Sequence, residues 1–211
     1  MSSVRVLKKA LRKELAGKLR VLSKETASQD SKLVTEKLLS LREYRNSQSV
    51  SVYISMDGEI DTREIIRNIF ETNKACYVPR FTGSTTMTMV KLTSWDDYLN
   101  LPMNKWNIPE PHADEVREDA LDKQGLDLII VPGVGFDVER NRIGHGRGYY
   151  DRYITKCAEW AALNNRLPPK TVALALQDQM VEIGRIPLEP TDRKPDVLLT
   201  PCEELRDAHK H

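Results

Sequence analysis

The sequence predicts an α/β fold, a single layered domain with a mainly parallel sheet flanked by helices. Strand-like segments alternate with segments of helical periodicity along the chain. Residues 126–131 (L-D-L-I-I-V) are almost continuously apolar, as expected for a strand that a parallel sheet buries on both faces. No repeat, low-complexity tract or linker divides the 211 residues. We therefore expect one domain over residues 1–211.

The first third of the chain is predicted to supply helices before and after one strand. Leucines recur at helical spacing over residues 4–23, and a second helix is expected over residues 28–41. Apolar residues alternate with polar ones over residues 49–54, which indicates a strand. Asp61 or Thr62 can cap the next helix, which is expected to run to about residue 73.

The rest of the chain continues this alternation around one long irregular connection. Residues 101–125 lack sustained periodicity and contain three prolines, and long connections of this kind are often functional. A glycine-rich loop and a helix over residues 149–163 follow the apolar strand. Further strands are expected over residues 75–78, 86–92, 171–176 and 196–200.

The composition excludes several classes of protein. Lys and Arg total 32 against 31 Asp and Glu, so no global positive charge attracts nucleic acid or an acidic membrane. No apolar run approaches the roughly 20 residues that span a bilayer. The three cysteines are far apart, which indicates a reducing setting without a disulfide framework or a zinc site. We expect a cytoplasmic monomer whose partners are small molecules.

Mitochondrial localisation is an alternative, because the first 24 residues are basic and amphipathic like a mitochondrial transit peptide. Glu14 and the unbroken helical pattern favour a retained helix instead.

The most distinctive segment is R-I-G-H-G-R-G-Y-Y-D at residues 142–151, where three glycines alternate between a strand and a helix. Glycine permits close backbone approach to a ligand, and amides at a helix N-terminus bind anions. Arg142, His145 and Arg147 add donors, which favours a polyphosphate site over a solvated turn. The segment is neither a P-loop nor a G-x-G-x-x-G fingerprint.

Two carboxylates could serve a polyphosphate site through a metal ion. Asp151 lies in the first turn of the helix after the glycines, where it either stabilises the helix dipole or holds Mg²⁺ beside phosphate. Asp192 is a possible second carboxylate, although spacing alone indicates only a loop residue.

The first helix places cations within or beside its apolar face. At 100° per residue, Lys8 falls inside the leucine arc, Arg12 at its edge and Lys9 beyond it. Lys8 and Arg12 either extend their charged ends to solvent or point one turn apart toward a buried anion.

Two other segments carry candidate ligand contacts. Glu59 and Met56 follow the strand at residues 49–54, at the sheet edge where α/β proteins bind ligands. Glu59 is either solvated or a contact for a polar ring. Trp106 is either core or a stacking surface for an aromatic ligand.

Together these residues resemble the 5-formyltetrahydrofolate cyclo-ligase family, also called 5,10-methenyltetrahydrofolate synthetases. The pieces that carry the resemblance occur in family order and span nearly the whole chain. They are L-R-K-E-L, S-M-D-G-E-I-D-T, W-N-I-P-E-P, L-D-L-I-I-V-P-G-V-G-F-D, N-R-I-G-H-G-R-G-Y-Y-D and T-D-R-K-P-D-V-L-L-T-P.

The resemblance implies an ATP-dependent ring closure on 5-formyltetrahydrofolate, with Mg²⁺ as cofactor and a phosphorylated formyl intermediate. It implies catalytic roles for Arg147 and Tyr149 and metal binding by Asp151 and Asp192. ATP would be bound by Lys8, Lys9, Arg12, Arg142, Ile143, Gly144, His145, Gly146, Arg147, Gly148, Tyr149 and Tyr150. The folate would be bound by Ile54, Met56, Glu59, Trp106, His145, Gly146, Arg147, Gly148 and Tyr149.

Two positions depart from the family pattern. His145 stands where an aromatic residue or arginine is common, and Thr191 stands where histidine often precedes the acid.

Two other functions remain open. One is an α/β enzyme that acts on a sugar phosphate or a coenzyme A thioester without ATP. The other is a non-catalytic folate- or nucleotide-binding protein.

Overall fold

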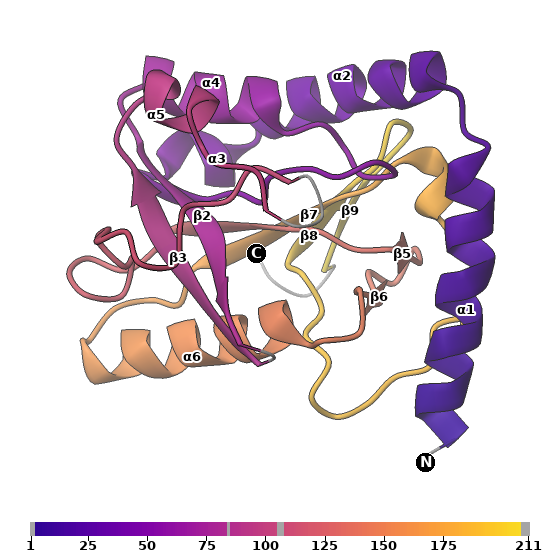
Figure 1. Cartoon of the computed structure of the whole chain (residues 1–211). Helices are drawn as coiled ribbons and strands as arrows, with labels where there is room; N and C mark the ends of the chain where they lie inside the picture. The colour runs from indigo at the N-terminus through magenta and orange to yellow at the C-terminus, as the bar shows by residue number, and fades with distance from the viewer. Residues whose placement is uncertain (1–2, 84, 105–107, 208–211) are drawn as a thin grey trace.

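A computed structural model describes residues 3–83, 85–104 and 108–207 and is built around one seven-stranded sheet (Figure 1). The strand order is β3-β2-β1-β4-β7-β8-β9. The four central pairings are parallel, and the two outermost pairings are antiparallel. The strands are β1 Ser49–Ser51, β2 Ala75–Thr82, β3 Thr86–Leu92, β4 Leu128–Val131, β7 Lys170–Leu174, β8 Val197–Leu199 and β9 Glu204–Arg206. The predicted fold class is therefore confirmed.

The centre of the sheet is its most buried part. All residues of β1, β4 and β8 are buried, as expected for central strands that are covered on both faces, and β4 and β8 are wholly apolar. The chain leaves β1 toward β2 on one side, whereas β4 lies on its other side. The strand order therefore reverses between β1 and β4, and open α/β sheets bind ligands at the carboxyl ends of the strands at such a point.

Helices cover both faces of the sheet, and one stands at its end. In Figure 1, α2 and α4 lie along one face and α6 lies along the other. Helix α1 stands beside the two-stranded hairpin of β5 (Gly135–Phe136) and β6 (Arg142–Ile143). The helices are α1 Ser3–Arg20, α2 Lys24–Ser40, α3 Arg42–Asn46, α4 Arg63–Glu71, α5 Trp95–Leu99, α6 Tyr149–Leu163 and the 3₁₀ turn η1 Gln177–Gln179.

The structure corrects several predicted boundaries. The first strand ends at Ser51 rather than at residue 54, and β2 extends four residues beyond the predicted strand at 75–78, because it pairs with β3 along its whole length. Helix α1 ends at Arg20, since Ser23 caps α2 by accepting a hydrogen bond from the Thr26 amide. The short elements α3, α5, β5, β6, β9 and η1 were not predicted.

Helix α1 buries the middle of the leucine arc that the sequence indicates but not Leu7, at the edge of that arc. Leu7 is 55% exposed, whereas Lys8, Leu11 and Leu15 are buried. Leu11 and Leu15 pack with Ile143 and two further apolar residues in a small cluster beside the main core. The apolar contact therefore fixes α1 against the segment that follows β4, at the carboxyl end of the sheet.

No helix within the described ranges is long and apolar enough to span a bilayer.

Candidate active site

The glycine-rich loop lies between β6 and α6, and its backbone needs glycine at two positions. Gly146 has φ 101°, and Gly148, the N-cap of α6, has φ 63° in the left-handed region. A Cβ on Gly146 would lie 3.3 Å from Cζ of Arg12, so the loop passes close under that guanidinium. The loop thus leads directly into the N-terminus of a 15-residue helix, where unpaired amides favour an anion.

Helix α1 brings two cations to this loop. Arg12 donates from Nε to the carbonyl of Gly144 at 2.6 Å. Lys8, one turn earlier, is buried, and its ammonium contacts Asp192 at 2.6 Å and Glu189 at 3.0 Å. Burial lowers the pKa of Arg12, while the negative charges of Asp192 and Glu189 act in the opposite direction. Both cations therefore point toward a buried polar site, and neither simply extends into solvent.

The turn after β1 faces the same loop. Glu59 has a side chain only 6% exposed, and its Oε1 lies 3.1 Å from Nε2 of His145. Its Oε2 accepts a hydrogen bond from the Met56 amide at 3.0 Å. Ile54 is buried beside this turn. A carboxylate with two fixed oxygens can accept paired N–H donors from a polar ring, so this geometry suits a ligand with such an edge.

Asp151 and Arg142 form an ion pair beneath the loop. Nη2 of Arg142 donates to Oδ1 of Asp151 at 2.6 Å, and the amide of Arg193 donates to the same oxygen at 3.0 Å. Nη1 of Arg142 donates to the carbonyl of Pro132, at the end of β4. Arg142 is therefore a buried brace between the loop and the sheet rather than an open phosphate donor. Oδ2 of Asp151 accepts no hydrogen bond from any described residue.

Asp192 is more fully engaged than Asp151. Both of its carboxylate oxygens accept hydrogen bonds from Lys8, at 2.8 and 2.6 Å, and Oδ2 also accepts one from the Glu189 amide. In the described ranges, no three His, Cys, Asp or Glu side chains form a group that could hold a metal ion. The available carboxylates instead fit the pattern of Mg²⁺, which takes one or two carboxylates and completes its shell with phosphate and water.

The two tyrosines at the start of α6 have different surroundings. The ring of Tyr149 packs against Phe81 in a tilted contact, with 4.8 Å between centroids and 50° between ring planes, and its hydroxyl donates to the carbonyl of Gly83. Tyr149 thus closes the loop against the tip of the β2–β3 hairpin. The Tyr150 hydroxyl is buried without a hydrogen-bond partner in the described residues, and burial raises its pKa. Its side chain belongs to the core, as does that of Ile143.

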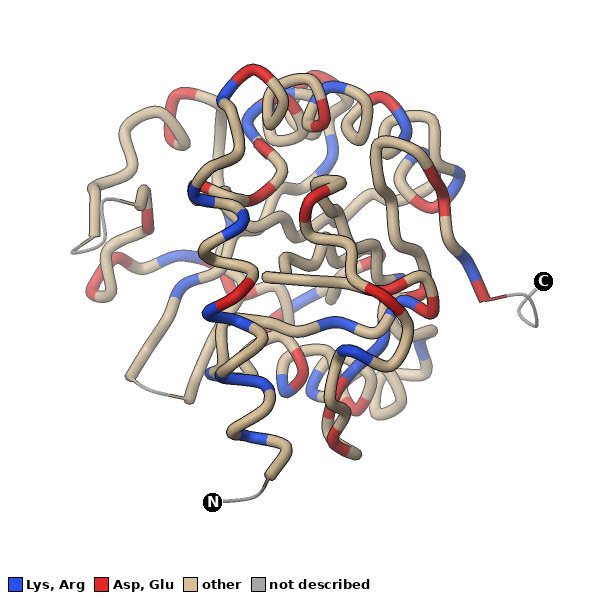
Figure 2. Tube along the Cα trace, turned by 90° about the vertical axis from the view of Figure 1, so that its right-hand side faces the viewer, with Lys and Arg blue, Asp and Glu red and all other residues tan. Residues whose placement is uncertain are grey.

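Two cations predicted to bind ATP remain exposed. Lys9 lies on the solvent side of α1, and Arg147 lies in the middle of the loop. Neither charged group makes a hydrogen bond or ion pair with any residue that the structure describes. Lys and Arg positions recur along α1 in the view that faces this helix (Figure 2). The cations near the loop are therefore of two kinds. Lys8 and Arg142 are buried and paired with carboxylates, whereas Lys9 and Arg147 are exposed and free to bind an anion.

The predicted site residues come together from four distant segments: α1, the turn at residues 54–59, the loop at 142–151 and the turn at 189–193. Trp106 lies outside the described residues. Sequence reasoning did not identify Glu189, Phe81 or Arg152. Arg152 joins Thr85 of the β2–β3 hairpin to the carbonyl of Arg147. Only long-range pairing reveals these three residues, and no local pattern marks them.

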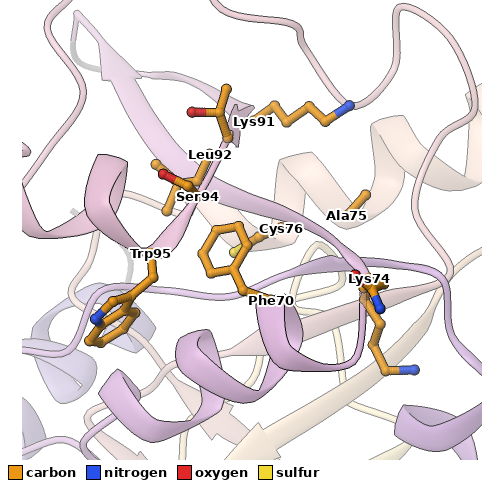
Figure 3. Close-up of a pocket in the computed structure, with 10 residues that line it drawn as sticks. Phe70, Lys74, Ala75, Cys76, Lys91, Leu92, Ser94 and Trp95 are labelled. Atoms are coloured by element: carbon orange, nitrogen blue, oxygen red, sulfur yellow. The ribbon is translucent and has the colours of Figure 1, made fainter.

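A surface hollow of about 350 Å³ lies elsewhere, between α4, β2, β3 and α5 (Figure 3). It contains none of the predicted site residues. The two lysines that line it are engaged: Lys74 donates to the carbonyls of Arg45 and Ser47, and Lys91 pairs with Glu118. The candidate active site is therefore at the glycine-rich loop, where cations, amides and carboxylates converge.

Comparison with known proteins gives a consistent result. Residues 4–201 match the family model of the 5-formyltetrahydrofolate cyclo-ligase family. The chain is 41% identical over 198 residues to the 5-formyltetrahydrofolate cyclo-ligase of Mus musculus, covering 93% of this chain and 95% of the relative. It is 36% identical over 206 residues to a probable 5-formyltetrahydrofolate cyclo-ligase of Caenorhabditis elegans, covering 97% and 98%. The NMR structure of Aquifex aeolicus 5,10-methenyltetrahydrofolate synthetase superposes with a TM-score of 0.73 at 29% identity, covering 97% and 95%. The chain therefore belongs to the 5-formyltetrahydrofolate cyclo-ligase family.

Proposed function

We propose that this protein converts 5-formyltetrahydrofolate to 5,10-methenyltetrahydrofolate and couples the reaction to cleavage of ATP, with release of ADP and phosphate. Family membership supports the overall reaction. The observation that carries the proposal is the convergence of Lys8, Arg12 and the 142–151 loop with the Glu59 turn at the reversal point of the sheet. A polyphosphate and a polar ring can therefore meet at one place.

The reaction proceeds in two steps. The formyl oxygen attacks the γ-phosphorus of ATP and ADP leaves, which gives a phosphorylated iminium species. N10 of the folate then attacks the formyl carbon and closes the five-membered ring. N10 loses its proton to solvent, the C–O bond breaks, and inorganic phosphate leaves. Phosphoryl transfer depends mainly on positioning and on stabilising charge, so the site needs cations and amides rather than a protein nucleophile.

The residues of the loop have separate roles in this proposal. Loop amides and the N-terminus of α6 bind the phosphates. Arg147 is exposed without a partner among the described residues, so its guanidinium can reach the transferred phosphoryl group at no cost in internal contacts. Arg142 and Ile143 are buried and act by holding the loop in place. Tyr149, packed against Phe81, closes the site beside the reacting groups.

The folate is recognised on the opposite side of the loop. Glu59 accepts the N–H donors of the pterin ring, and Ile54 and Met56 form an apolar wall beside it. His145 contacts Glu59 in the structure, so the ring either displaces this imidazole or binds beside it.

Mg²⁺ fits the residues at the other end of the loop. The open Oδ2 of Asp151 supplies one carboxylate oxygen, and Asp192 lies on the adjoining turn. When bound, Mg²⁺ would neutralise charge on the phosphates and on the leaving ADP. Asp151 and Asp192 would hold it, and phosphate oxygens and water would complete its shell.

We further propose that the chain acts as one domain and as a cytoplasmic monomer. The packing of α1 supports this compartment over a mitochondrial one reached through removal of the first 24 residues. Leu11 and Leu15 are buried, and Lys8 and Arg12 belong to the site. Cleavage after residue 24 would therefore remove part of the catalytic machinery.

The direct test is to follow the absorbance band of the methenyl product with and without Mg·ATP. The proposal requires product formation only when both Mg²⁺ and ATP are present. Product without ATP would indicate a different enzyme of this architecture. Folate or nucleotide binding without turnover would indicate a non-catalytic binding protein. Either result would contradict the proposed function.

A further inference from the structure

Lys8 is held by two carboxylates at the edge of the site. Its ammonium lies 2.6 and 2.8 Å from the two oxygens of Asp192 and 3.0 Å from Oε2 of Glu189. The side chain is only 8% exposed, which is low for a lysine near a protein surface. One buried ammonium thus occupies both oxygens of Asp192 and one of Glu189.

The turn at residues 189–192 is built to hold these carboxylates together. The Glu189 amide donates to Oδ2 of Asp192 at 2.8 Å, and the Asp192 amide donates back to the Glu189 carbonyl at 2.9 Å. The negative charges of both acids also act on Arg12, whose pKa they raise against the effect of burial. The turn therefore fixes the Asp192 carboxylate, and the Lys8 ammonium joins it to the carboxylate of Glu189, whose side chain is 42% exposed.

Asp151 provides the contrast. Its Oδ1 is engaged by Arg142 and by the Arg193 amide, but its Oδ2 accepts no hydrogen bond in the described parts of the chain. A divalent cation can thus approach Asp151 as the structure stands. At Asp192 the Lys8 ammonium fills that position, and two cations at the same oxygens would repel each other strongly.

We propose that Lys8 blocks Asp192 from divalent cations until a polyphosphate draws its ammonium away. The movement of Lys8 opens a cation site at Asp192, and Glu189 is a further residue of that site. The inference rests on the proposed function for the identity of the polyphosphate, ATP. Lysine suits this exchange because its charge lies at the end of a flexible stem and pairs equally well with carboxylate or phosphate.

The exchange makes metal and nucleotide binding mutually dependent. When the ammonium moves to phosphate, the two carboxylates lose their counterion, and a divalent cation restores the balance of charge. Tighter metal binding in the presence of nucleotide implies tighter nucleotide binding in the presence of metal, by the same factor. The nucleotide-free protein should accordingly bind divalent cations weakly.

The test measures Mn²⁺ binding to the full-length, nucleotide-free protein, by electron paramagnetic resonance of the free ion. Lys8→Met should bind Mn²⁺ at least about 10-fold more tightly than the wild type, because a like charge in contact with the site has gone. Adding Asp192→Asn to Lys8→Met should abolish the gain, and adding Glu189→Gln should reduce it. Mn²⁺ should also raise the Tm of Lys8→Met more than that of the wild type.

Lys13→Met is the matched control, because Lys13 is an exposed lysine of the same helix outside the site. It removes the same charge and should leave Mn²⁺ affinity unchanged. Equal affinity of Lys8→Met and wild type, or an equal gain in Lys13→Met, would overturn the blocking role of Lys8. A full gain that survives Glu189→Gln would overturn the role of Glu189.

The wild-type protein provides a second measurement should Lys8→Met fail to fold. Its Mn²⁺ affinity should rise at least about 10-fold when a non-hydrolysable ATP analogue is bound, because the phosphates then compete for Lys8. An unchanged affinity in a protein that binds the analogue would overturn the inference. If the analogue does not bind, the proposed function fails, whereas the nucleotide-free comparison of Lys8→Met with wild type still tests the inference.

Discussion

Gly146→Ala tests the link between the conformation of the glycine-rich loop and nucleotide binding. Gly146 has φ 101°, which an L-residue adopts at a cost of about 1–2 kcal/mol. The added Cβ would also lie 3.3 Å from Cζ and 3.4 Å from Nη1 of Arg12, close enough to displace this guanidinium by a few tenths of an ångström. For a chain of this length, each kcal/mol lowers Tm by about 2–4 °C, so we expect a fall of about 2–8 °C.

The same substitution should weaken ATP binding. The Nε of Arg12 is held on the loop by its 2.6 Å hydrogen bond to the Gly144 carbonyl. A displaced guanidinium would no longer be placed to donate a hydrogen bond to the phosphates. Losing one charge-assisted hydrogen bond costs about 1.5 kcal/mol, which raises the Kd for ATP about 10-fold. Thermal unfolding followed by circular dichroism and calorimetric titration with ATP measure the two effects.

Gly17→Ala is the matched control, because it makes the same chemical change inside α1, where no atom lies within 4 Å of the added Cβ. Alanine is favoured over glycine within a helix by about 0.5–1 kcal/mol, so this variant should raise Tm and leave ATP affinity unchanged. An unchanged or raised Tm for Gly146→Ala would refute the backbone argument. A lowered Tm with unchanged ATP affinity would refute the coupling through Arg12.

Three other perturbations test separate parts of the structure. Arg147→Ala should raise the Kd for ATP about 10-fold without lowering Tm, since its guanidinium has no partner among the described residues; an unchanged Kd would contradict its role. Asp151→Asn should raise the Mg²⁺ concentration that half-saturates activity, and an unshifted Mg²⁺ titration would count against metal binding by Asp151. The same variant should lower Tm, because buried Arg142 loses its charged partner. Hydrogen bonds from Arg117 lower the pKa of Asp97 from 3.8 to about 2, so the stability from this pair is complete above about pH 4 and is lost toward pH 2. Asp97→Asn should flatten the stability curve in that range, as urea unfolding at several pH values would reveal.

The sequence predicted the elements whose signals are local. An apolar run such as β4 has one stable position in an α/β protein, the middle of the sheet, and every residue of β4 is indeed buried there. The helix after the glycines begins at Tyr149 and ends at Leu163 as predicted, because Gly148 provides the left-handed N-cap and the pattern of buried residues continues to Ala161. Composition and periodicity therefore suffice for the layers of the fold.

Features that depend on distant residues could not be predicted in the same way. Helical periodicity counted Leu7 in the apolar face of α1, but the structure leaves it 55% exposed. Periodicity placed Lys8 inside the same arc, where it is buried, but could not show which groups neutralise it. Lys8 is buried because Glu189 and Asp192 neutralise it, and these acids lie 181 and 184 residues further along the chain. Likewise, the two-residue strands β5 and β6 exist only because they pair with each other. A strand of two residues has too short a pattern to be recognised.

The near-neutral net charge of the chain does not show how charge is distributed at the site. Arg142 is paired with Asp151, and Lys8 with Asp192 and Glu189, so much of the positive charge near the loop is already neutralised without nucleotide. Arg147 and Lys9 are exposed and lack partners among the described residues, so they can attract an incoming polyphosphate at once. The buried ammonium of Lys8 can contribute only by leaving Asp192 and Glu189, and the partly buried carboxylate of Asp192 then loses its counterion. Binding of a polyphosphate at this loop is therefore an exchange of ion partners, and it is complete only when another cation replaces the one that moved.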